Sequence, residues 1–121
     1  MQRLRARTIG AVLTGIAVLA TTTACGREEK ATSDEPVVID ITFENGEVSP
    51  NGDRVQVGAG QPIDLVVTAD EAGELHIHSE PQQELPYPAG TETLKIQIDR
   101  PGVVEVESHE LGQVIVQLEV R

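Results

Sequence analysis

Apolar and polar residues alternate along most of this 121-residue chain from Pro36 onward, and this alternation limits the fold more than any other feature. Side chains two residues apart lie on the same face of a β-strand, so a period of two predicts strands with one buried and one solvated face. No stretch after residue 24 has the periodicity of an amphipathic helix. Seven short strands separated by turns predict an all-β, antiparallel β-sandwich, with strands in the segments 37–43, 54–57, 62–68, 73–80, 91–99, 103–108 and 113–120.

One segment between these strands is rich in proline and predicts a long loop, Glu80–Gly90. Pro81, Pro86 and Pro88 have no backbone N–H to donate, which disfavours regular strand pairing. Leu85 and Tyr87 lie among these prolines and have two interpretations. Either they cover one end of the sandwich, or they form a preordered contact patch for an envelope protein partner.

The N-terminus has the features of a targeting segment. A basic start (Arg3, Arg5 and Arg7) precedes a mainly apolar run at 9–20, which is too short for a comfortable membrane span. These features predict a signal peptide helix at 1–24. Residues 26–35 are polar without apolar periodicity and predict a flexible tether, which leaves 36–121 as the single folded domain.

The residues around the only cysteine, Thr21-Thr22-Thr23-Ala24-Cys25-Gly26, resemble the lipobox of bacterial lipoproteins, with Thr22 where that motif usually has Leu. The resemblance implies that Cys25 becomes the lipidated first residue of the mature chain. A diacylglyceryl group, with palmitate-type acyl chains, would anchor the domain to the outer face of the cell membrane, because two chains suffice for stable binding. An ordinary cleaved signal peptide, giving a secreted protein with a free Cys25 thiol, is the alternative.

The charge of the chain after residue 24 excludes one class of partner. It keeps six basic residues against all twenty acidic ones, a net charge of about −14, since the remaining basic residues are Arg27, Lys30, Arg54, Lys95, Arg100 and Arg121. Such a surface repels nucleic acid. Phe43 and Tyr87 are the only aromatic residues, so no platform for stacking bases is expected either.

Residues 37–121 resemble the cupredoxin-like domains of bacterial lipoproteins. The first half, VVIDITFENGEVSPNGDRVQVGAGQPIDLVVTADEAGELHIHS, matches the family's order of strands and turns up to the strand with the first copper histidine. The second half, LPYPAGTETLKIQIDRPGVVEVESHELGQVIVQLEV, matches its Pro-Ala-Gly hairpin and its closing strands. The resemblance implies a Greek-key sandwich, with His76 at the first ligand position and His109 near the second.

The thiolate copper chemistry of that family is not expected in this chain. A blue-copper site needs a cysteine thiolate, two imidazoles and usually a methionine. The position that the resemblance gives to the cysteine holds Ser108, and Met1 is the only methionine.

The histidines themselves suggest another kind of site. His76 and His78 fall on one face of a strand, and a third imidazole, His109, gives a possible ligand set for copper or zinc. These three histidines are the predicted metal site. By the same parity Ser108 faces the core, so His109 faces outward and converges with the pair only if the two strands are neighbours.

Other functions remain open at this point. The histidines and nearby glutamates would form cross-strand pairs on a wet face in a metal-free structural or protein-interaction module, or a pH-responsive surface. Catalysis is not expected, because Ser108 and His109 point to opposite faces and cannot act as nucleophile and base. The sequence therefore predicts a cell-envelope lipoprotein with a degenerate cupredoxin-like binding domain.

Overall fold

The computed structural model describes residues 34–121, and its regular structure consists of β-strands. No helix in this part of the chain is long and apolar enough to cross a membrane. The predicted signal peptide, Cys25 and the tether up to residue 33 lie outside the described residues. The strands are β1 (Val37–Glu44), β2 (Glu47–Ser49), β3 (Asp53–Val57), β4 (Pro62–Ala69), β5 (Gly73–Ile77), β6 (Gln83–Tyr87), β7 (Gly90–Gln97), β8 (Gly102–Ser108) and β9 (Gln113–Val120).

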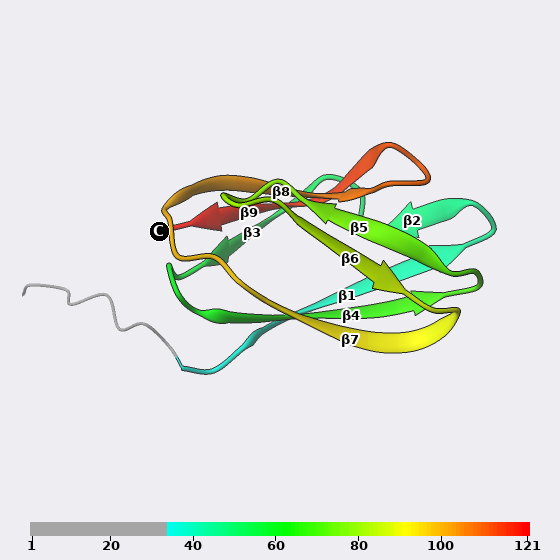
Figure 1. Cartoon of the computed structure of the whole chain (residues 1–121), viewed down its shortest axis with the longest axis horizontal. Helices are drawn as coiled ribbons and strands as arrows, with labels where there is room; N and C mark the ends of the chain where they lie inside the picture. The colour runs from blue at the N-terminus through cyan, green and yellow to red at the C-terminus, as the bar shows by residue number, and fades with distance from the viewer. Residues whose placement is uncertain (1–33) are drawn as a thin grey trace, which may run out of the picture.

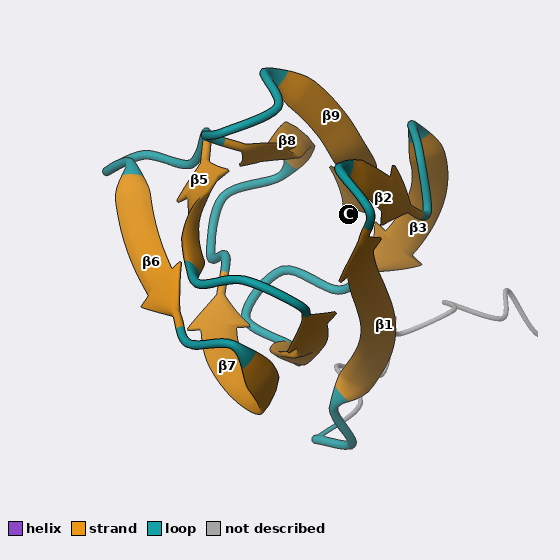
Figure 2. Ribbon diagram, turned by 90° about the vertical axis from the view of Figure 1, so that its right-hand side faces the viewer, coloured by secondary structure: helices purple, strands orange, loops and turns teal. Residues whose placement is uncertain are grey.

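The strands form two sheets that enclose one hydrophobic core (Figures 1 and 2). The smaller sheet has the order β2-β1-β4-β7, and the larger has the order β3-β9-β8-β5-β6. The predicted all-β sandwich is therefore confirmed. Each sheet buries one face against the other and exposes the second face to water, as the alternation predicted.

The strand number and two pairings differ from the sequence-based expectation. Residues 34–121 form nine strands, and β1 pairs with β4, and β3 with β9, in parallel rather than antiparallel orientation. Alternation of residue types specifies which face is buried, but it carries no information on the direction of the neighbouring strand. In both parallel pairs the chain passes through the opposite sheet between the two strands, through β3 for β1 and β4, and through β4 and β7 for β3 and β9.

The alternating residues of the strands form the core. In β1, Ile39, Ile41 and Phe43 are buried, whereas Val38 on the opposite face is 57% exposed. A large aliphatic side chain that is fully buried contributes about 1.5–3 kcal/mol to folding relative to an exposed one. The largest side chains without solvent contact are Ile41, Ile63, Leu65, Leu75, Ile77, Ile115 and Leu118.

The predicted loop Glu80–Gly90 is wrong, because its centre forms β6. This strand lies at the edge of the larger sheet, with Pro86 opposite Glu74 of β5. An edge strand bonds to a neighbour on one side only, so it tolerates a residue that cannot donate on the other side. Tyr87 at its end is 5% exposed and stacks on Phe43 with 5.1 Å between ring centroids, so it covers the core as the first interpretation predicted.

Candidate functional site

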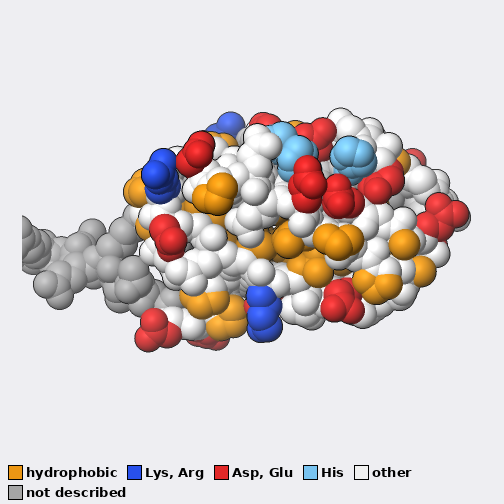
Figure 3. Space-filling view, in the orientation of Figure 1, with side chains coloured by type: hydrophobic (Ala, Val, Ile, Leu, Met, Phe, Trp, Pro, Cys, Tyr) orange, Lys and Arg blue, Asp and Glu red, His pale blue; other side chains and the backbone are white. Residues whose placement is uncertain are grey.

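His76 in β5 and His78 directly after the strand lie on the outer face of the larger sheet, as their spacing predicted. Leu75 and Ile77 are fully buried on the inner face, so His76 and His78 point the other way. Their rings contact each other, with centroids 4.6 Å apart and planes inclined by 36°. In Figure 3, histidine side chains lie beside acidic side chains on one part of the surface.

Glu107 of β8 completes this cluster, which we call the HxH cluster (His76, His78 and Glu107). The ring N–H of His78 donates to the carboxylate of Glu107, with 2.7 Å between Nε2 and Oε2. Both side chains are about one-third exposed, at 34% and 29%. In the sheet, Glu107 lies opposite His76, at a register shift between Val106 and Glu107, and reaches diagonally to His78.

One ring nitrogen of His76, the other imidazole of the cluster, has no hydrogen-bond partner. Nε2 of His76 is buried and has no hydrogen-bond partner in the structure. A buried polar atom without a partner costs about 1–3 kcal/mol, and most such atoms in folded proteins are paired. This nitrogen therefore needs an explanation, such as a bound group that it would contact.

His109 takes a different position from the other two histidines. It lies in the turn after β8, is exposed, and its backbone N–H donates to the carbonyl of Glu74 at 3.1 Å. Ser108 was expected to face the core and His109 to face outward, and this is correct, because Ser108 is fully buried. Strands β5 and β8 are neighbours, as convergence required. Across residues 34–121, however, the structure brings no three histidine, cysteine or acidic side chains into position for a metal ion, so the three-histidine set stays a prediction.

A blue-copper centre does not fit these residues. Ser108, at the position expected for the cysteine, lies opposite Leu75 on the inner face of the sheet, where its Oγ accepts a hydrogen bond from the N–H of Leu111. His76 points to the outer face, so the two positions cannot share one ion. The chain also has no cysteine or methionine within residues 34–121.

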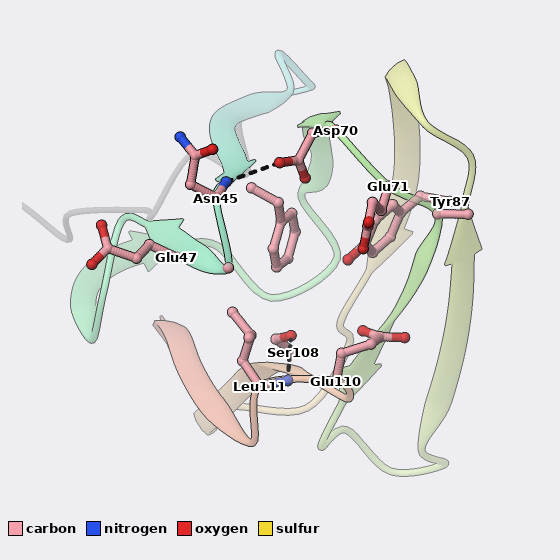
Figure 4. Close-up of a pocket in the computed structure, with 11 residues that line it drawn as sticks. Asn45, Glu47, Asp70, Glu71, Tyr87, Ser108, Glu110 and Leu111 are labelled. Carbon is pink, nitrogen blue, oxygen red and sulfur yellow. Dashed lines mark hydrogen bonds between the residues drawn. The ribbon is translucent and has the colours of Figure 1, made fainter.

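A pocket of about 380 Å³ opens at the end of the sandwich where β1, β4, β6 and β8 finish. We call it the end pocket; Phe43 and Tyr87 line it, and so do four acidic residues, Glu47, Asp70, Glu71 and Glu110 (Figure 4). Asp70 accepts a hydrogen bond from the N–H of Asn45 at 2.9 Å, and Glu110 accepts one from the N–H of Glu74 at 3.0 Å. These bonds fix two of the four carboxylates.

Tyr87 is expected to ionise at unusually high pH. Burial, and then the negative charges of Glu110 and Asp70, raise the pKa of its hydroxyl from 10.0 to about 12. Because the folded protein holds this proton more tightly than the unfolded chain, the free energy of unfolding should fall as pH rises from about 10 to about 12. Tyr87 is the only tyrosine, so tyrosinate absorbance reports on it alone.

The measurement is a pH titration of the folded full chain, with the chain in urea as the reference. Glu110→Gln should lower the midpoint and leave it above the urea value, since burial is the larger cause. A folded-state midpoint equal to the urea value would contradict the expected burial.

Comparison with known proteins shows which fold the chain has, but it does not show which family the chain belongs to. No family model and no curated protein sequence matches the chain. Among solved structures, the P52G mutant of amicyanin in its reduced Cu(I) form has a TM-score of 0.54 at 9% identity, over 76% of this chain and 88% of that one. Auracyanin A, a "blue" copper protein of Chloroflexus aurantiacus, has a TM-score of 0.53 at 13% identity, over 72% of this chain and 100% of that one. These similarities show that residues 34–121 have a cupredoxin-like β-sandwich fold.

Proposed function

We propose that the domain is an extracytoplasmic binding module that holds a divalent transition metal, copper or zinc, at the HxH cluster. The observation that carries this proposal is the buried, unpartnered Nε2 of His76 beside the His78–Glu107 pair. A metal ion at this nitrogen would satisfy it. Imidazole and carboxylate donors together suit Zn(II) and Cu(II).

The distance between the rings supports a shared ion. A metal about 2 Å from an imidazole nitrogen lies about 3.2 Å from the ring centroid, so two rings on one ion at 90–110° have centroids about 4.5–5.2 Å apart. His76 and His78 have centroids 4.6 Å apart. Glu107 would supply an oxygen ligand, or would orient His78 through the hydrogen bond it already accepts. Small side-chain rotations would be needed, because no three donors are already in position in the described part of the chain.

Calorimetric titration with Cu(II) and Zn(II) tests this proposal. The double variant His76→Ala/His78→Ala should lose binding, and Glu107→Gln should weaken it by about 10-fold or more. His109→Ala serves as the comparison: unchanged binding would limit the site to the HxH cluster, and weaker binding would add His109 as the third imidazole. Absence of binding at millimolar metal, or full binding by the double variant, would contradict the proposal and favour a metal-free module.

We further propose that this module is a lipoprotein, anchored to the outer face of the cell membrane through Cys25. The lipobox-like segment and the preceding apolar run support this proposal. The strands begin at Val37, so eleven residues (26–36) separate them from Cys25. A polar tether of this length would hold the HxH cluster and the end pocket in the aqueous phase near the membrane.

A further inference from the structure

The end pocket combines an aromatic wall with uncompensated negative charge. Its wall is the stacked pair Phe43 and Tyr87, and none of its lining residues is Lys, Arg or His. The ion pairs of the described residues involve none of its four carboxylates. All four acidic residues are exposed to solvent, so water screens their mutual repulsion, and a cation that entered the pocket would still be attracted to the group.

A second, independent feature of the pocket concerns the hydroxyl of Tyr87. Only 5% of the surface of Tyr87 is accessible to solvent, and its side chain lines the pocket (Figure 4). Within residues 34–121 the hydroxyl makes no hydrogen bond with any side chain or backbone group. Within residues 34–121 the only buried side-chain nitrogen or oxygen without a partner is Nε2 of His76, so the Tyr87 hydroxyl is open to the pocket and available to a ligand there.

The shape of the pocket distinguishes between two kinds of cation. A calcium ion needs six to eight oxygens at about 2.3–2.6 Å, whereas two of the four carboxylates of the pocket already accept backbone N–H groups. The carboxylates instead surround a volume of about 380 Å³, at the lower end of the range for small-molecule pockets. An organic cation fills such a volume, and aromatic rings attract its charge.

We propose that the end pocket binds a small organic ammonium ion. Its alkyl groups would contact Phe43 and Tyr87, its charge would lie among the carboxylates, and a ligand hydroxyl or N–H would pair with the Tyr87 hydroxyl. This proposal is independent of the metal at the HxH cluster, because the two sites share no residue.

The test uses choline and its neutral isostere, 3,3-dimethylbutan-1-ol, with the full chain. Tyr87 is the only tyrosine and there is no tryptophan, so intrinsic fluorescence reports on the end pocket directly, and calorimetry gives the affinity. Choline should change the fluorescence saturably and bind about 10-fold or more tightly than the isostere. Glu47→Gln/Glu71→Gln should weaken choline binding about 5–10-fold.

Matched variants separate a specific site from the general negative field. Glu92→Gln removes the same charge from an exposed position on β7, outside the pocket, and should change choline binding less than twofold. His76→Ala/His78→Ala should bind choline normally, so failure of the metal proposal would leave this one intact. Equal affinity for the isostere, equal loss with Glu92→Gln, no saturation with choline, or displacement of choline by stoichiometric calcium would each overturn the proposal.

Discussion

Gly73→Ala is expected to destabilise the domain by about 2–3 kcal/mol, although alanine is an otherwise conservative replacement. A Cβ at this position would lie 2.7 Å from Cζ of Tyr87, closer still to its hydroxyl, and 2.9 Å from Oε2 of Glu110. Tyr87 would have to leave its stack with Phe43 or β5 would have to move. Both responses cost packing energy and change the end pocket.

Urea unfolding measures this effect, and Tyr87 fluorescence shows whether the ring has moved. Gly58→Ala is the matched control, since a Cβ there meets only ordinary contacts with Gln61 at 3.4 Å and 3.5 Å. It should change the free energy of unfolding by less than about 0.5 kcal/mol. If the two variants are equally stable, the Tyr87 ring is not held where the structure has it.

Cys25→Ser is expected to release the protein from the membrane fraction and to remove the mass of the lipid. The thioether to diacylglycerol requires the sulfur of Cys25, the only cysteine of the chain. Two acyl chains give stable anchoring, so most of the protein with Cys25 intact should be membrane-bound. The variant should instead be found in the soluble or secreted fraction, or retained as the uncleaved precursor.

Detergent phase partitioning and intact-protein mass spectrometry check this outcome. Ser33→Ala, a change in the tether that leaves the lipobox-like segment intact, is the control and should stay with the membrane. An unchanged mass and membrane fraction for Cys25→Ser would show that the cysteine carries no lipid.

Much of the fold was predictable because one side-chain period dominates the sequence. Strands such as β1, in which Ile39, Ile41 and Phe43 are buried in alternation, were correctly located from this pattern alone. The pattern failed at β6, where Pro86 is compatible with a strand only because that strand lies at an edge. Whether a segment is an edge depends on its tertiary neighbours. The sequence around Pro86 carries no signal of it.

The candidate sites were predictable only in part, for a similar reason. The shared outward face of His76 and His78 follows from their spacing. The contact of His78 with Glu107 depends on the pairing of β5 with β8 and on a register shift between β8 and β9, which no local rule specifies. The end pocket is formed by residues from four separate chain segments, and Tyr87 and Ser108 among them were singled out from the sequence without a pocket being predicted.

The pairing of β3 with β9 has a consequence for how the domain acquires its structure. β3 ends at Val57, yet its hydrogen-bonding neighbour β9 begins only at Gln113, with five other strands between them in the sequence. Sheets that depend on contacts between distant residues fold slowly, because the entropy cost of closing a long loop comes before the hydrogen bonds that offset it. When the chain is synthesised from its N-terminus, the edge of β3 that pairs with β9 is therefore exposed until β9 has been synthesised. During that interval its acidic charge is the main protection against association with other copies.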